Sequence, residues 1–131
     1  MRDAFTNFGN IAITAAATEA SKAVKSENII DLVAKSKLEA GLHELRFVFC
    51  PKASYTGTIT FQVAQSDTIT SNELASPVVT DTFTVTNPTA NKKIIKPFVL
   101  ENQKKYMQIF AYGSAGTVVS VEAWLEFGEG A

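Results

Sequence analysis

The sequence has one cysteine, one histidine and no long apolar run, and each shortage excludes a class of protein. Cys50 has no second cysteine with which to form an intramolecular disulfide, so the fold is expected to depend on packing alone. No apolar run approaches the roughly 18 residues of a membrane-spanning helix, and the opening MRDAFTNFGN lacks the apolar core of a signal peptide. We therefore expect a protein that works where it is made, or in an assembly built there, without a membrane.

Residues that could carry catalysis or bind a metal are equally scarce. His43 is the one imidazole, and together with Cys50 it cannot supply the three or four ligands of a common zinc site. The Asp and Glu residues are spread singly, so no calcium loop and no carboxylate pair for glycoside hydrolysis stands out. Cys50 ends the apolar run FVFC, where a free cysteine usually behaves as a small buried hydrophobic residue. We expect no enzyme activity, no metal and no cofactor.

Neither sign of charge predominates, because 12 Lys and Arg residues and 13 Asp and Glu residues leave a net charge of -1. A non-specific nucleic-acid binder usually needs a large positive field, so nucleic acid is not an expected partner. Lysines gather at Lys92, Lys93 and Lys96 and again at Lys104 and Lys105, and we interpret them as solvated strand ends.

What the chain has is the composition and length of one globular domain. It is 131 residues long and 46% hydrophobic, which is enough for one core and too little for two full domains. No repeat and no linker divides it. We expect a single domain over residues 1–131, with residues 1–9 as a possible flexible arm.

Apolar and polar residues alternate from residue 43 onward, which is the pattern of half-buried strands. The last strand is the most regular, since Val119, Val121, Ala123, Leu125 and Phe127 share one face. The sequence predicts about eight antiparallel strands, at residues 10–14, 27–33, 43–50, 57–66, 81–86, 92–100, 104–112 and 116–127. Their number and spacing indicate an all-β domain, a jelly roll or β-sandwich with an irregular N-terminal segment.

Three local features refine this prediction. Pro97 lies inside a strand pattern, which places that strand at a sheet edge or beside a bulge. Residues 113–116 contain two glycines and predict a hairpin between the last two strands. Residues 15–40 combine helix-favouring Ala, Glu and Lys with a β-branched stretch, and we favour a strand at 27–33 between mobile or partly helical loops.

The aromatic residues leave two interpretations open. Tyr55, Tyr106, Tyr112 and Trp124 could form a platform for a sugar, although aromatic residues on strands more often belong to a core or an interface. Trp124 lies on the otherwise polar face of the last strand, so an interface or ligand role and a packing role against a second layer are equally compatible with its position.

Three segments within about residues 10–127 carry a recognisable pattern: AITAAATEASKAVKSENIIDL, ITFQVAQSDTITSNELASPVV and KKYMQIFAYGSAGTVVSVEAWLEF. Together they resemble the small capsid cement, or decoration, proteins of tailed bacteriophages. The segment KSKLEAG is more charged than the family's turn, and MRDAFTNFGN does not match clearly. The resemblance implies a jelly-roll subunit that forms a homotrimer near capsid three-fold positions and clamps neighbouring subunits of the major capsid protein.

The resemblance also implies a location on the capsid surface of a virion that is assembled in the bacterial cytoplasm. For the capsid contact we nominate Arg2, Asp3, Phe5 and Phe8, as an arm ordered only against the capsid or a neighbouring subunit. The alternative that both phenylalanines cap the chain's own sheet stays open. For the trimer interface we nominate Trp124 and Tyr112.

Other functions remain in competition with capsid cement. One is a different virion role, as a tail protein or the base of a head fibre. Another is a carbohydrate-binding module, which shares the sandwich architecture. An enzyme is the least favoured class, because no reactive group is paired with a partner in the sequence.

Overall fold

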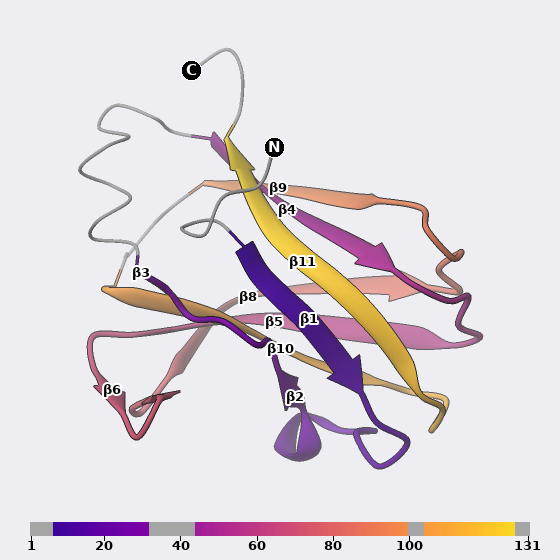
Figure 1. Cartoon of the computed structure of the whole chain (residues 1–131), viewed down its shortest axis with the longest axis horizontal. Helices are drawn as coiled ribbons and strands as arrows, with labels where there is room; N and C mark the ends of the chain where they lie inside the picture. The colour runs from indigo at the N-terminus through magenta and orange to yellow at the C-terminus, as the bar shows by residue number, and fades with distance from the viewer. Residues whose placement is uncertain (1–6, 32–43, 100–103, 128–131) are drawn as a thin grey trace.

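Alternating apolar and threonine-rich segments form strands throughout the computed structural model (Figure 1), which describes residues 7–31, 44–99 and 104–127. Side chains at successive strand positions point to opposite faces, so each such segment can bury one face and leave the other in water. Within the described residues the one helical element is a short 3-10 turn, η1 (Ala20–Lys22). The prediction of an all-β fold is confirmed.

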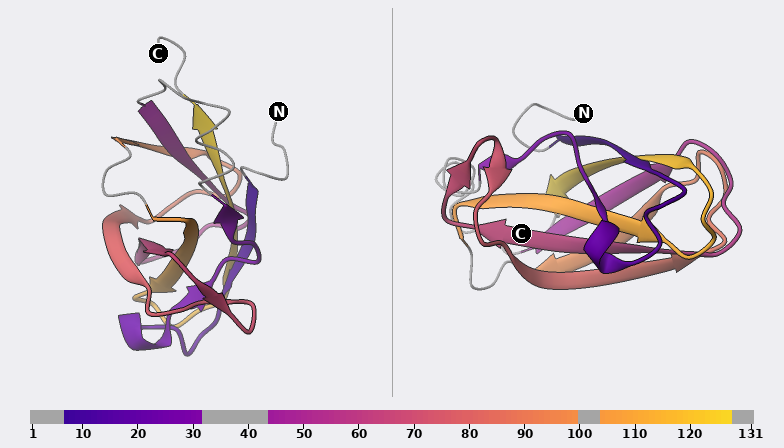
Figure 2. Two further views of the ribbon diagram at one scale, coloured as in Figure 1. Left: turned by 90° about the vertical axis from the view of Figure 1, so that its left-hand side faces the viewer. Right: turned by 90° about the horizontal axis from the view of Figure 1, so that it is seen from below.

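Two antiparallel sheets pack face to face, and the left-hand view in Figure 2 shows them as separate layers. The first, called sheet A, has the order β1 (Asn7–Ile13), β11 (Val119–Phe127), β4 (Glu44–Pro51) and β9 (Ile94–Val99). The second, called sheet B, has the order β2 (Val24–Lys25), β10 (Tyr106–Gly113), β5 (Thr58–Ser66) and β8 (Val78–Thr86), and β3 (Ile30–Asp31) also pairs with β10. A small separate hairpin joins β6 (Ile69–Thr70) to β7 (Glu73–Leu74).

This strand order is that of a jelly roll, in which the chain crosses repeatedly between the two sheets. The crossing corrects one prediction. Residues 113–116 do not form a hairpin, because β10 belongs to sheet B and β11 to sheet A. A glycine-containing turn indicates a reversal of the chain, but it does not determine whether the two strands pair within one sheet or lie in two different sheets.

Tyr55 stabilises the connection between β10 and β11, since its hydroxyl accepts a hydrogen bond of 2.8 Å from the backbone N–H of Ala115.

The core consists of the inward faces of both sheets. Phe49 of sheet A and Phe61 of sheet B stack across the interior with ring centroids 4.0 Å apart. The predicted inward face of the last strand is confirmed for the four residues whose side chains are described, namely Val119, Val121, Ala123 and Leu125, while the side chain of Phe127 lies outside the described residues. Aromatic and β-branched side chains thus fill the space between the layers, as sheet packing at about 10 Å requires.

The N-terminal third differs most from the expectation. The strand predicted at 27–33 is confirmed only at Ile30–Asp31, and residues 32 and 33 lie outside the described residues. Of the expected arm, residues 7–9 belong to β1, and residues 1–6 lie outside the described residues. Strand β1 therefore begins three residues earlier than the alternation indicated, at a bulge between Asn7 and Gly9.

Two smaller predictions can be compared directly. Pro97 lies in β9, which is an edge strand of sheet A, so the predicted edge position is confirmed. Cys50 was expected to be buried, but it is half-buried. It lies opposite Glu122 of β11 and thus on the outer face of sheet A. Because side chains alternate between the two faces of a strand, the residue that follows the inward-facing Phe49 points outward.

Candidate functional site

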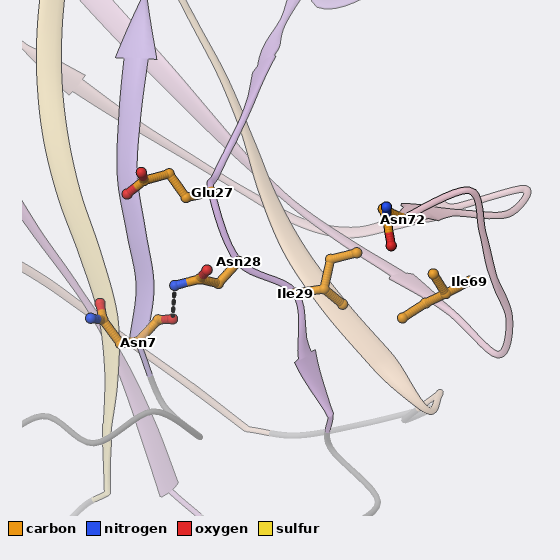
Figure 3. A pocket seen from close by; sticks show the side chains of 6 residues that line it. All are labelled: Asn7, Glu27, Asn28, Ile29, Ile69 and Asn72. Atoms are coloured by element: carbon orange, nitrogen blue, oxygen red, sulfur yellow. Dashed lines mark hydrogen bonds between the residues drawn. The ribbon is translucent and has the colours of Figure 1, made fainter.

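A groove of about 550 Å³ lies at the rim of the sandwich, between the segment that precedes β3 and the β6–β7 hairpin (Figure 3). Its described lining residues are Asn7, Glu27, Asn28, Ile29, Ile69 and Asn72. Two isoleucines contribute apolar surface, and three amides and one carboxylate contribute hydrogen-bonding groups. Ile69 is 38% exposed, so this apolar surface is accessible from solvent.

One wall of this groove also closes the outer edge of β1. The backbone N–H groups of Glu27 and Asn28 donate to the carbonyls of Asn10 and Phe8, at 3.2 and 2.9 Å. The Glu27 carboxylate accepts a hydrogen bond of 2.7 Å from the backbone N–H of Asn10. The Asn28 amide donates to the carbonyl of Asn7 at 3.1 Å (Figure 3). Four polar contacts therefore join this segment to an edge that would otherwise present unpaired backbone groups.

Gly9 explains why the segment can approach so closely. Its φ is +83°, a conformation that side-chain-bearing residues rarely adopt. A Cβ at this position would also lie 2.8 Å from Oε1 of Glu27. Glycine at position 9 thus permits both the bulge in β1 and the contact with Glu27.

Trp124, a nominated trimer residue, lies on the outer face of sheet A opposite Val48 of β4. It is only 5% exposed. Its indole N–H donates to Oε2 of Glu126 at 2.9 Å, and Nζ of Lys93 lies 5.6 Å from the ring centroid. Of the two roles left open for Trp124, packing within its own chain is the one that this burial supports. The trimer contact nominated from the sequence is the competing expectation, and the two roles differ in whether Trp124→Ala changes the oligomeric mass.

Tyr112 and Phe8, the other nominated residues that the structure describes, do not form one cluster with Trp124. Tyr112 is half-buried and packs against the core from sheet B, the opposite layer from Trp124. Phe8 is fully buried and packs against Phe47 in a tilted arrangement at a centroid distance of 6.0 Å, so it is a core residue of its own chain rather than part of an arm. Arg2, Asp3 and Phe5 lie outside the described residues.

The aromatic platform suggested for a sugar is also dispersed. Tyr55 is 4% exposed and is occupied by its contact with Ala115. Tyr106 and Tyr112 lie on β10, and Trp124 lies on the other sheet. These four residues therefore do not share one face.

The β6–β7 hairpin lies against sheet B and is held there by polar contacts. Lys25 of β2 forms an ion pair of 2.6 Å with Glu73 of β7, and this contact holds the pKa of the Glu73 carboxyl below its ordinary value of 4.5. Ser66 donates a hydrogen bond to the carbonyl of Ala75 and so closes the base of the hairpin. Lys104 lies 3.6 Å from a carboxylate oxygen of Asp67.

The side of the sandwich opposite β1 and β2 is formed by β8 and β9, which are the edge strands of their sheets. We call it the open side, because its inward-facing side chains are not fully covered. Phe83, Val85 and Ile94 point toward the core from these two strands, yet they are only partly buried. The lysine cluster at 92, 93 and 96 lies on the same side, at the start of β9.

No protein-family model, curated protein or solved structure matches the chain. Among residues 7–31, 44–99 and 104–127, no group of three or more His, Cys, Asp or Glu side chains could hold a metal ion. No helix in that same part of the chain has the length and apolar character needed to cross a membrane. His43 lies outside the described residues.

Sequence reasoning missed both the groove and the open side. The groove is made by three separate segments, around residues 7, 27–29 and 69–72, whose asparagines carry no distinctive motif. The open side had one usable signal, the absence of acidic residues between residues 82 and 99 beside three lysines.

Proposed function

We propose that this chain is a virion structural protein, a capsid cement protein that binds the outside of a bacteriophage head as a homotrimer. In this role it stabilises contacts between subunits of the major capsid protein, acts by binding rather than by catalysis, and needs no cofactor. Its location is the capsid surface, after assembly in the bacterial cytoplasm.

The observation that carries the proposal is the jelly-roll strand order of a sandwich whose interior is filled by its own side chains. Jelly rolls occur in viral capsid proteins, in lectins and in cupins, so the fold alone does not choose among them. The stacking of Phe49 on Phe61 occupies interior space, so a ligand held between the two sheets is not favoured. A sandwich packed in this way interacts through its edges and outer faces.

The three segments that resemble cement proteins give the second support. They supply β2, β3, β5, β10 and β11, together with the hairpin that lies against sheet B. The likeness therefore involves both sheets rather than one local motif.

Such a protein would stabilise a head by mass action. Binding to one state of the shell stabilises it by RT ln(1 + [L]/Kd), which is about 2.7 kcal/mol per site when the free concentration is 100 times Kd. Three copies of one patch around a three-fold axis add avidity, so each contact can be small.

The test is co-sedimentation of the purified protein with heads of the phage that encodes it, prepared without the protein. The proposal predicts saturable binding and a higher temperature of head disruption when the sites are full. An absence of binding at micromolar protein would contradict the proposal.

A polysaccharide panel in a thermal-shift assay tests the carbohydrate alternative. The rim groove offers amides and a carboxylate, but its described lining residues include no aromatic ring on which a sugar could stack. A melting point raised by one glycan, together with no binding to heads, would favour a carbohydrate-binding module.

A further inference from the structure

The β6–β7 hairpin is attached to the sandwich by few contacts. With its flanks it comprises residues 67–76, which we call the flap, and it lies at the end of β5 and β8 (Figure 1). Leu74 is the one buried side chain in this range. At the base of the flap, Asp67 contacts the side chain of Lys104 and accepts a hydrogen bond from the backbone N–H of Lys105. Segments with so few buried apolar contacts open at a lower free energy than the strands of a core.

The flap has a latch at one strand and a hinge at its base. The latch is the ion pair between Lys25 of β2 and Glu73 of β7, whose side chains are 42% and 61% exposed. The hinge is Ser66, whose hydroxyl accepts a hydrogen bond of 3.2 Å from the backbone N–H of Thr68 and donates one to the carbonyl of Ala75. Ser66 thus joins the two ends of the flap, and its bonds can persist while the rest of the flap moves.

The flap covers the outer face of β10 around Gln108. Met107 and Ile109 are fully buried in the core, so Gln108 between them points to the outer face. Phe110 is the next residue of β10 on that face, and it pairs with Lys25, which contacts the flap. Strand β7 itself lies beside β10. Gln108 is accordingly only 5% exposed, although it points away from the core.

The side chain of Gln108 disfavours the closed position of the flap. Its N–H group donates to the carbonyl of Ser26 at 2.8 Å, but its Oε1 is buried and has no hydrogen-bond partner among the described residues. A buried acceptor without a partner loses the hydrogen bonds that water would supply. Opening of the flap would let water reach this oxygen, so the open position recovers those hydrogen bonds.

Three residues of the flap have a left-handed backbone conformation without being glycine. They are Ser71, Asn72 and Ser76, with φ of +52°, +63° and +45°. Ser71 and Asn72 form the two-residue turn between β6 and β7, where positive φ at both positions favours Asn-Gly. Asparagine tolerates this conformation, whereas serine adopts it less readily. The flap therefore holds backbone strain that opening can release.

From these observations we propose that the flap opens from sheet B by rotation about Ser66, while the two sheets stay packed, and that it thereby opens and closes the rim groove. Ile69 and Asn72 line the groove across from Ile29 (Figure 3). Because both belong to the flap, the groove has this wall only while the flap is closed. A ligand that fills the groove would therefore also hold the flap closed. The motion does not depend on the cement role, because it needs only one chain.

Native-state hydrogen exchange, measured by NMR on the full chain, tests the motion. A two-stranded hairpin alone is marginally stable in water, so detachment should expose the amides of the β6–β7 ladder. We expect these amides to be protected, but at least about a hundredfold less than those of Phe61 and Ile109, and with little dependence on urea below the unfolding transition. Equal protection and equal urea dependence at both places would overturn the proposal. Exchange of the ladder at the unprotected rate would also overturn it, because no closed position would then exist.

Two variants separate opening of the flap from unfolding of the whole domain. Ile59→Val removes a methyl group from the core at the end of β5 farthest from the flap, and it weakens the closed and open positions alike. Protection of Ile109 should therefore fall about two- to tenfold, while protection of the ladder stays at the wild-type value. Leu74→Ala removes the buried anchor, so protection of the ladder should fall at least about tenfold. An equal fall at Ile109 and in the ladder with Ile59→Val, or an unchanged ladder with Leu74→Ala, would contradict the proposal.

A matched pair of charge variants tests the latch. Glu73→Gln removes the ion pair with Lys25, and Glu122→Gln removes an ion pair of 3.8 Å with Lys52, which lies on sheet A rather than at the flap. Glu73→Gln should lower the protection of the ladder about two- to fivefold, as expected for an exposed pair, and Glu122→Gln should leave it unchanged. Unchanged protection in Glu73→Gln, or an equal fall in both variants, would refute this ion pair as the latch.

Discussion

Replacing Trp124 with alanine should destabilise the fold of the single chain and leave its oligomeric mass unchanged. Trp124 is 5% exposed, so nearly all of its side chain is removed from water. A tryptophan side chain buries on the order of 200 Å², which at about 25 cal/mol per Å² corresponds to roughly 5 kcal/mol. Residual burial in the unfolded chain reduces this figure by up to about 40%, to roughly 3 kcal/mol.

The position of the residue favours the lower figure. Trp124 lies on the outer face of sheet A, so water can fill the space that truncation leaves. We therefore expect a loss of about 3 kcal/mol in the free energy of unfolding, measured by urea denaturation. Trp124→Phe keeps most of the apolar area and loses the hydrogen bond to Glu126, so its loss should be about 1 kcal/mol.

Light scattering on a sizing column supplies the second measurement for both variants. Lower stability with unchanged mass supports packing within the chain. A variant that keeps its denaturation midpoint but loses mass would refute this reasoning, because it would make Trp124 an interface anchor.

Two further predictions concern local contacts. Gly113→Ala should destabilise the fold by about 1–3 kcal/mol, because the new Cβ would collide with the hydroxyl and Cζ of Tyr55. In a double-mutant cycle, Tyr55→Leu, which removes both atoms, should recover at least about 1 kcal/mol of this loss. Additive losses in urea denaturation would contradict the contact. Because Lys25 lowers the pKa of Glu73 in the folded chain, the contribution of this pair is present above pH 4.5, the ordinary value, and is lost as the pH falls through the folded pKa. Glu73→Gln should therefore be less stable than wild type at pH 7 and equal to it at pH 2, and a stability difference independent of pH would refute the ion pair.

Sequence alternation predicted best the strands that have a neighbouring strand on both sides, such as β5 and β11. The alternate residues from 59 to 63 in β5 and from 119 to 125 in β11 are apolar and buried, so a period of two is sufficient to identify each strand and its inner face. Pro97 similarly identified an edge strand, because proline cannot donate to a second neighbour.

The elements that sequence reasoning missed depend on contacts between distant residues. Strand β2 was not predicted, and only Ile30–Asp31 of the strand predicted at 27–33 forms β3; both strands contain two residues and exist because they pair with β10, some 80 residues away. No local pattern encodes such pairing. Trp124 illustrates a related limit, since alternation placed it on the outer face but could not show that Lys93 and Glu126 would cover it.

The candidate sites were less predictable than the fold for the same reason. The rim groove combines common polar residues from three segments, and its members are adjacent only after the two sheets have formed. The open edge of β8 was detectable in part, because the absence of acidic residues from 82 to 99 is visible in the sequence, but which strands are edges follows only from the sheet order.

The most direct test of the cement role is electron cryo-microscopy of heads prepared without this protein and then saturated with it. The proposal predicts new three-lobed density on the outer surface near three-fold positions, with each lobe fitted by one jelly-roll subunit. Heads that show no added density after incubation with saturating protein would contradict the proposed function.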